Sequence, residues 1–392
     1  MSLDSPFDLE IDRRGTHSMK WDMMEPLYGV SPDDGLSMWV ADMDFRPPQV
    51  VQDALQEMLD HGVYGYFGDP SKYNAAIQWW MKERHGWELS ASAIFTTHGL
   101  VNGTGLCVDA FTEPGDGVVL FTPVYHAFAR VINAAGREVV ELEMVNNDGR
   151  YGLDFEAYNA QMTGREKLLI LCSPHNPSGR VWTKAELEGV AEFARRHDLV
   201  LVSDEIHHDL TFSATHIPMT HIEGIADRLV MMTASTKTFN IAGAHIGNVI
   251  IEDEALRKRF AARMGGLGLS PNSFGLFMAT AAYSSEGAAW VDELCTYLDG
   301  NRKLFDEAVN AIPGLHSMEL EATYLSWVDF SGTGMKMSEF TNRVEKGAKI
   351  AVNHGPTFGK GGDDFLRFNI ATPRARIQKA VERLADAFSD LQ

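Results

Sequence analysis

Three polar residues, Lys237, Asp204 and Asn176, each follow an apolar run of the length typical of a buried strand. A lysine just past a core strand has its stem among apolar groups, which lowers the pKa of the amine and favours the nucleophile that Schiff-base chemistry requires. Because the carboxyl ends of parallel strands line one crevice, we expect the carboxylate and the amide to face the same ligand as the amine. Taken alone, Lys237 is more typical of a solvated loop lysine, so the agreement of the three positions carries the prediction of an active site.

The elements that must position these residues alternate between strands and helices from residue 93 onward. The apolar patterns predict strands at 93–97, 118–121, 167–172, 199–202, 229–233 and 248–251, and helices at 48–61, 71–85 and 184–197. The last of these strands is expected at an edge of the sheet, and Thr183 with Glu186 forms a capping box before the last of these helices. This alternation predicts an α/β fold with a mainly parallel sheet.

The two ends of the chain predict a second, smaller unit. Its patterns are a helical tract at 288–312, a helix at 337–347, strands at 323–329, 350–353 and 365–370, and a helix after Pro373. We therefore expect a large domain at 46–287 and a small α+β domain built from both termini, residues 1–45 and 288–392.

Composition and charge limit the classes of partner. The 34 Lys and Arg against 54 Asp and Glu give a net charge of −20, which argues against binding to nucleic acid or to an anionic membrane. Three widely spaced cysteines without a CxxC motif disfavour a disulfide scaffold or a zinc ribbon and fit a reducing compartment. The sequence has no apolar run near 18 residues and no signal-peptide pattern, so we expect a soluble, cytoplasmic protein.

A lysine amine, a carboxylate and an amide at one sheet edge suit pyridoxal 5′-phosphate (PLP). In that arrangement Lys237 binds the cofactor as a Schiff base, Asp204 pairs with the pyridine nitrogen and Asn176 donates to the ring oxygen. The turn at 98–103 leads from a strand into a helix, and the backbone N–H groups at such a turn bind phosphate readily.

Two other kinds of site are less consistent with the sequence. The acidic and histidine-rich stretch 204–209 suggests a metal site, but in a strand the adjacent His207 and His208 point to opposite faces and would not readily share one ion. We therefore predict no metal. A Ser/His/Asp hydrolase is disfavoured because no GxSxG motif follows a predicted strand.

Three motifs, in this order, resemble the fold-type I, class I/II aminotransferase superfamily of PLP enzymes. They are SPHNPSG at 173–179, SDE at 203–205 and STKTFNIAG at 235–243, and the stretches 11–22 and 38–45 resemble its cystathionine β-lyase (β-C–S lyase) branch. This resemblance implies a three-layer α/β/α PLP-transferase fold, an amino-acid substrate and a homodimer with shared active sites. It also implies β-elimination of a sulfur amino acid such as L-cystathionine to a thiol, pyruvate and ammonia.

The same resemblance assigns roles to individual residues. The cofactor-binding residues are Lys237, Asp204, Asn176, Tyr125, Leu100, Val101, His207 and Thr236. The substrate-binding residues are Arg367, which would bind the α-carboxylate, Val40 and Tyr66. Lys237 and Tyr66 would be catalytic, with Tyr66 reaching into the site of the neighbouring subunit.

Alternatives to these roles remain open at this point. Without the resemblance, Tyr66 and Tyr125 are also typical of packed or rim aromatics, and Arg367 of a surface ion pair. Three positions depart from many members of the superfamily: Ala234 replaces a serine, His245 an arginine and His207 a tyrosine. Because of Ala234 and His245, we expect a less cationic phosphate site. An aminotransferase and a regulatory binding protein on the same fold are the alternative functions.

Overall fold

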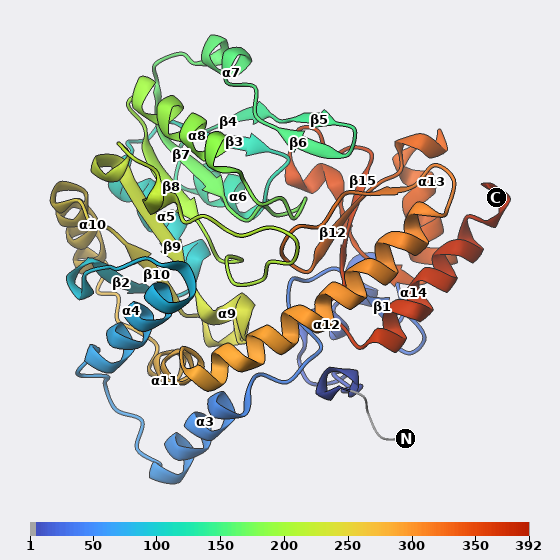
Figure 1. Ribbon diagram of the computed structural model, residues 1–392, viewed down its shortest axis with the longest axis horizontal. Helices are drawn as coiled ribbons and strands as arrows, with labels where there is room; N and C mark the ends of the chain where they lie inside the picture. The colour runs from blue at the N-terminus through green and yellow to red at the C-terminus, as the bar shows by residue number, and fades with distance from the viewer. Residues whose placement is uncertain (1–4, 392) are drawn as a thin grey trace.

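A seven-stranded sheet forms the centre of the computed structural model, which describes residues 5–391 (Figure 1). Its strands are β2 (Ile94–Thr97), β10 (Gly247–Ile250), β9 (Leu229–Thr233), β8 (Val200–Asp204), β7 (Glu166–Cys172), β3 (Gly117–Thr122) and β4 (Glu138–Glu143), in that spatial order. The five strands from β9 to β4 are parallel, so their carboxyl ends lie at one edge of the sheet.

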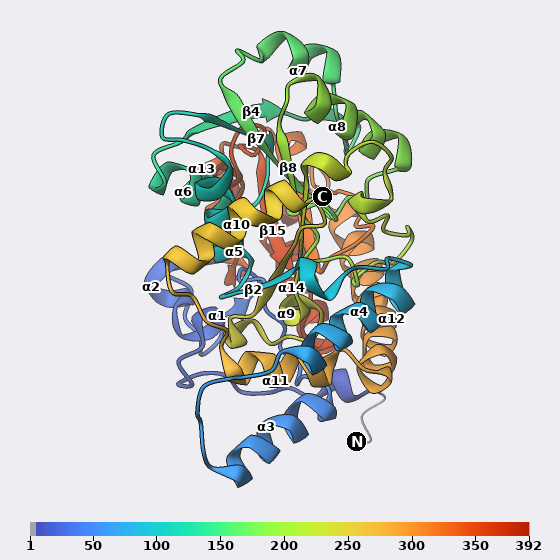
Figure 2. The ribbon, with the colours of Figure 1, turned by 90° about the vertical axis from the view of Figure 1, so that its left-hand side faces the viewer.

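Helices cover both faces of this sheet, as the edge-on view in Figure 2 shows. One face carries α5 (Leu100–Phe111), α6 (Ala127–Ala134) and α10 (Glu254–Gly266). The other carries α4 (Ser71–His85), α7 (Phe155–Gln161), α8 (Lys184–Arg196) and α11 (Ser273–Ala282), the last of which also packs against α3 (Gln49–His61). The fold is therefore a three-layer α/β/α arrangement, as the sequence predicted.

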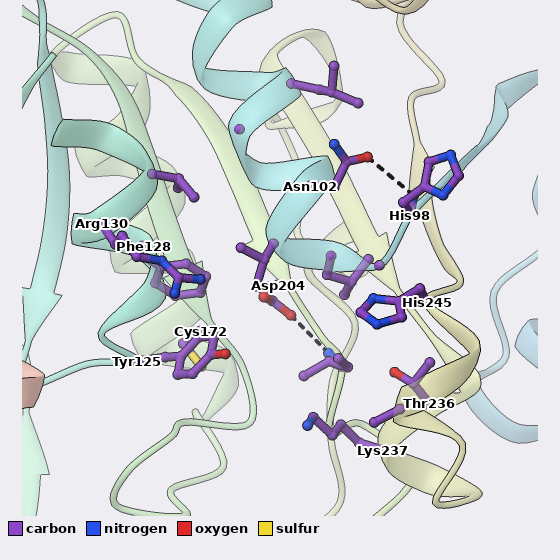
Figure 3. A pocket seen from close by; sticks show the side chains of 18 of the residues that line it. His98, Asn102, Tyr125, Phe128, Arg130, Cys172, Asp204, Thr236, Lys237 and His245 are labelled. Carbon is purple, nitrogen blue, oxygen red and sulfur yellow. Dashed lines mark hydrogen bonds between the residues drawn. The ribbon is translucent and has the colours of Figure 1, made fainter. Parts of the chain in front are cut away.

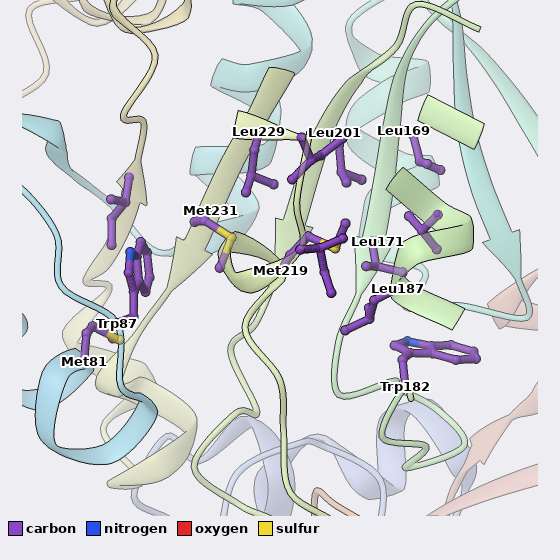
Figure 4. Packing of buried hydrophobic residues seen from close by; sticks show 14 of the residues in the cluster. Met81, Trp87, Leu169, Leu171, Trp182, Leu187, Leu201, Met219, Leu229 and Met231 are labelled. Atoms are coloured by element: carbon purple, nitrogen blue, oxygen red, sulfur yellow. The ribbon is translucent and has the colours of Figure 1, made fainter. Parts of the chain in front are cut away.

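The strands supply alternate residues to the two apolar layers because successive side chains point to opposite faces. In β3, Val118 and Leu120 pack with α5 and α6, whereas Val119 and Phe121 pack with α7 and α8. Figure 4 shows the second layer, where Leu169 and the neighbouring strands meet α8 and the segments around it. Burial on both faces explains why these strands read as continuous apolar runs.

A second, smaller sheet gathers residues from the C-terminal part of the chain. It has the order β11 (His316–Ser317), β12 (Leu325–Asp329), β15 (Phe365–Asn369) and β14 (Asn353–His354), and it packs with α12 (Ser285–Asn310), α13 (Met337–Asn342) and α14 (Arg374–Ala387). The N-terminal β1 (Leu36–Ser37) pairs with β13 (Ile350–Ala351), so both ends of the chain contribute to this region.

The predicted domain limits stay a prediction. The proposed boundary at 287/288 lies inside α12, which runs from beside α11 to beside α14 (Figure 1). Along this helix, Val291 packs into the core of the large sheet, and Leu294 and Leu298 pack into the core of the small one. The residues outside 5–391 fall within the predicted small domain and are not described.

Two predicted strands differ from the structure. The prediction of an edge strand at 248–251 is wrong, because β10 lies between β2 and β9 and is antiparallel to both. The predicted strand at 350–353 is two short strands, β13 and β14, which belong to different sheets. Both errors concern pairing with distant segments, which a local apolar pattern does not encode. Within the described range, no helix combines the length and apolar character needed to cross a membrane.

Candidate active site

A cavity of about 890 Å³ opens at the carboxyl ends of the parallel strands. Lys237, Asp204 and Asn176 all line it, so the three residues that the strand ends predicted lie together. In Figure 3, Tyr125 lies on one side of this cavity and Thr236 on the other. The volume is within the range of pockets that enclose small molecules.

Lys237 lies in α9 (Ser235–Thr238), a single helical turn that follows β9 directly. Its Nζ donates a hydrogen bond of 2.6 Å to the carbonyl oxygen of Ala41. Burial lowers the pKa of Lys237 to about 8, and the nearby Arg367 adds to this shift. The unprotonated amine is therefore a minority form at pH 7, but a far larger fraction than for an ordinary lysine, and this is the form that attacks carbonyl compounds.

Asp204 ends β8, and burial raises its pKa to about 7. Its Oδ1 accepts a hydrogen bond of 3.2 Å from the backbone N–H of Ile206, drawn in Figure 3. In the described part of the chain, no cationic side chain lies within ion-pair distance of this carboxylate. An ionised carboxylate without a cation is costly in a buried site. A ligand with a protonated ring nitrogen would supply the missing positive charge, so the site fits the pyridinium of PLP.

The start of α5 forms another wall of the cavity. Gly99, with φ +83°, precedes the helix, and the backbone N–H groups of Leu100 and Val101 stand in its first turn, where N–H groups have no acceptor within the helix. Thr236 and His245 line the same end (Figure 3). Helix-start N–H groups and a hydroxyl are suitable donors to a phosphate.

Arg367 projects from β15 and is buried, so the alternative of a surface ion pair is wrong. Its guanidinium donates to Asn176 Oδ1 at 2.8 Å, Asn353 Oδ1 at 2.5 Å and the Trp39 carbonyl at 3.0 Å. All three acceptors are neutral, and burial lowers the pKa of Arg367 to about 10. Arg367 is not among the residues that line the cavity, but its bond to Asn176, which does line it, holds an oriented cation next to the cavity. The bond to Arg367 also fixes the Asn176 amide, whose NH₂ is left as a donor.

Of the remaining predicted residues, His207 and Val40 lie in or beside the cavity, and Tyr66 lies away from it. His207 lines the cavity, and burial, reinforced by Lys237 and Arg367, keeps its pKa well below the usual value. Val40 contributes its backbone carbonyl, which accepts from Asn369 Nδ2 at 2.5 Å. Tyr66, by contrast, is fully exposed and does not contact the cavity of its own chain.

His207 and His208 point in different directions, but not because adjacent strand residues face opposite sides of a sheet, as the sequence predicts. β8 ends at Asp204, so His207 and His208 lie in a turn and not in a strand. His207 faces the cavity, whereas His208 is buried near Asp209. Among residues 5–391, two groups lie close enough to hold an ion by distance alone: His85, His208 and Asp209, and Glu205, His208 and His216. Both carboxylates in these groups already accept hydrogen bonds from protein donors.

Residues 34–384 match the family model of aminotransferase class I and II. The chain belongs to this family. It is 39% identical to cystathionine beta-lyase PatB of Bacillus subtilis over 98% of this chain and 100% of that protein. It is 31% identical to protein MalY of Escherichia coli over 97% of this chain and 98% of the relative.

Two solved structures resemble this chain over nearly its whole length. Cystalysin from Treponema denticola, which contains a pyridoxal 5′-phosphate cofactor, superposes with a TM-score of 0.93 at 35% identity, covering 98% of this chain and 99% of that one. The PLP-bound C-S lyase from Staphylococcus hominis gives 0.90 at 29% identity, with 99% of each chain covered. The predicted family and fold are confirmed, and the roles of individual residues stay predictions.

One part of the site of this aminotransferase-family chain was not predicted. Ala41 accepts hydrogen bonds from Lys237 and from the hydroxyl of Tyr324, the latter at 3.0 Å. Asn369 Nδ2 donates to the carbonyls of Val40 and Asp42, which fixes the backbone on either side of Ala41. The stretch 38–45 had been assigned only by resemblance, and nothing in its residue types indicates that a backbone carbonyl would meet the lysine.

Proposed function

We propose that this protein uses PLP to catalyse β-elimination from a sulfur amino acid, giving a thiol, pyruvate and ammonia. The observation that carries the proposal is that a buried lysine amine and a buried carboxylate, which has no ion pair among residues 5–391, line the same cavity. The lowered pKa of Lys237 and the raised pKa of Asp204 support it. When bound, PLP supplies an electron sink that withdraws electrons from the Cα of an amino acid. The lyases among the relatives support the choice of β-elimination.

The residues of this chain then have distinct tasks. Arg367 binds the substrate carboxylate, which orients Cα toward Lys237. Lys237 holds the cofactor and, once released, takes the proton from Cα. Asp204 remains ionised beside the ring nitrogen and keeps it protonated. Asn176 would donate its amide to the ring oxygen, and Tyr125 would lie against the ring.

The phosphate of the cofactor would lie at the start of α5. The N–H groups of Leu100 and Val101 and the hydroxyl of Thr236 would be its donors, and His207 would form a further part of the cavity wall. Val40 is assigned to the substrate by resemblance, and it lies next to Ala41, which lines the cavity. No lysine or arginine is assigned to the phosphate, so dipolar donors hold it with the help of the helix dipole.

The exposed segment around Tyr66 fits a homodimer. We place this homodimer in the cytoplasm. Tyr66 is fully exposed, and the neighbouring Val63 and Tyr64 are also exposed, so this segment presents an apolar surface that a second copy would cover. Tyr66 would then enter the cavity of the partner and assist at the leaving sulfur. The net charge of −20 favours small-molecule substrates over nucleic acid.

The decisive experiment measures pyruvate released from L-cystathionine by PLP-loaded protein with no keto acid added. We expect pyruvate and thiol in equal yield, and no turnover by Lys237→Ala. A reaction that requires a keto-acid acceptor and forms no pyruvate would identify an aminotransferase. Undiminished turnover by Lys237→Ala would contradict the assignment of the lysine.

A further inference from the structure

A buried carboxylate, Asp209, lies behind the catalytic lysine and outside the residues that line the cavity. Its Oδ1 accepts hydrogen bonds from Trp80 Nε1 at 2.9 Å and from His85 Nε2 at 2.8 Å, both from α4. Its Oδ2 accepts a hydrogen bond of 2.7 Å from the hydroxyl of Thr238, the last residue of α9. Asp209 therefore joins three elements: α4, the turn after β8 and the helical turn that carries Lys237.

The charge on Asp209 strengthens this junction. Although burial alone raises the pKa of a carboxyl group, the neighbouring His208 and His85 hold the pKa of Asp209 well below its usual value. The group is thus an ionised acceptor at neutral pH. Hydrogen bonds to an ionised acceptor are stronger and shorter than those to a neutral one. The bond from Thr238 is of this kind.

α9 depends on such contacts because it is only four residues long. One isolated helical turn is not stable in water, since its nucleation fixes several residues for a single hydrogen bond. The residue after it, Phe239, is buried against two aromatic rings. Its ring centroid lies 5.3 Å from that of Trp80 and 6.0 Å from that of Tyr283. Asp209 adds a directional contact next to the lysine itself, which apolar packing cannot supply.

We propose that Asp209 is a positioning residue that, through Thr238, fixes α9 and thereby the point from which the Lys237 amine reaches the substrate. The inference rests on the proposed function, in which Lys237 must be released before it takes the Cα proton. A released lysine has no covalent bond to hold it, so its position then depends on α9. A displacement of about 1 Å can cost about 10²-fold in rate.

The test compares two substitutions that differ in one hydroxyl. Thr238→Val keeps the shape of the side chain and removes the donor to Asp209, whereas Thr238→Ser keeps the donor. We expect Thr238→Val to lower kcat about 10- to 100-fold with little change in KM, because the substrate carboxylate is held elsewhere. With Cα-deuterated substrate, its primary isotope effect should exceed that of wild type, since proton transfer becomes slower. Thr238→Ser should resemble wild type.

A second measurement does not use the loaded enzyme. In cofactor-free protein, acylation of Lys237 can be followed by mass spectrometry across a range of pH. The wild type should react with a midpoint near the lowered pKa of about 8. In Thr238→Val the midpoint should rise, because a displaced amine is better hydrated. Tm identifies any variant that is unfolded, and Thr238→Ala replaces Thr238→Val if the latter does not fold.

The outcomes separate the two proposals. If wild type releases no pyruvate, the proposed function is wrong, and the acylation profile still tests the positioning role. If wild type is active and Thr238→Val matches it in kcat, isotope effect and acylation, the positioning role is overturned. Equal losses in Thr238→Val and Thr238→Ser would overturn it too, because the hydroxyl would not be the group that matters.

Discussion

Arg367→Gln removes the only cation that the proposed function assigns to the substrate carboxylate. In the structure the guanidinium already meets three neutral acceptors, Asn176, Asn353 and the Trp39 carbonyl, and among residues 5–391 no carboxylate pairs with it. A substrate carboxylate that takes the place of one neutral acceptor of Nη2 would form two charge-assisted hydrogen bonds with the guanidinium. At about 1.5–3 kcal/mol each, their loss corresponds to about 3–6 kcal/mol.

This free energy predicts a fall in kcat/KM of about 10²- to 10⁴-fold, in an assay of pyruvate release from L-cystathionine. Most of the loss should appear in KM, because the carboxylate is bound in the ground state as well as in the transition state. Arg367→Lys is the matched control: it keeps the charge but not the planar fork, so its loss should be intermediate.

A substrate in which an amide replaces the α-carboxylate makes the experiment a double-mutant cycle. If Arg367 acts on the carboxylate, wild type and Arg367→Gln should differ little toward this amide, and the coupling between the two changes should be large. An equal loss of kcat/KM for the acid and the amide would refute the reasoning. The Tm of the variant must be measured as well, because Asn176 and Asn353 lose a buried donor.

Three further predictions concern other residues. Asp204→Asn should weaken PLP binding, as fluorescence titration would measure. In cofactor-free protein the same change should raise Tm at pH 8 but not near pH 4. Asp204 has a pKa of about 7 in the folded state and about 4 in the unfolded state, so its ionisation lowers the free energy of unfolding as pH rises from about 4 to about 7. The total loss is roughly 4 kcal/mol, which the substitution removes. Lys237→Ala and Tyr66→Ala should each be inactive alone. When the two variants are coexpressed, random pairing makes about half of the dimers mixed, and each mixed dimer has one intact site of two, so about a quarter of wild-type activity should return. No recovery would contradict the exchange of Tyr66 between subunits. Thr183→Ala breaks the capping box with Glu186 and should lower the free energy of unfolding by about 1 kcal/mol. Calorimetry should show a fall in Tm of about 1 °C, and kcat should be unchanged.

The parts of the fold that sequence reasoning predicted are those encoded over a few residues. The strand 229–233 was predicted with its observed limits, and the capping box of Thr183 was found where α8 begins. Both depend on short apolar runs or on a hydrogen bond between residues three apart. The position of β10 depends instead on its pairing with β2, about 150 residues earlier in the chain, and was predicted wrongly.

The same distinction holds for the site. Asp204 and Asn176 could be placed because Asp204 ends its strand and Asn176 lies in the turn that follows its strand, and parallel strands share a carboxyl edge. The carbonyl of Ala41 could not be placed, because every residue has one and only the tertiary fold decides which carbonyl meets Lys237. Asp209 was missed for a related reason: its partners Trp80, His85 and Thr238 come from distant parts of the chain.

Burial has opposite chemical consequences for the two central groups of the cavity, and together they specify the ligand. It favours the uncharged amine of Lys237 and the uncharged acid of Asp204, so each group is poised near neutral pH to change its charge. The amine is ready for a carbonyl carbon, and the acid is ready for a basic nitrogen. Since both line one cavity, the ligand that suits them carries an aldehyde and a basic ring nitrogen in one molecule. PLP has both, and the N–H groups at the start of α5, which line the same cavity, would hold its phosphate.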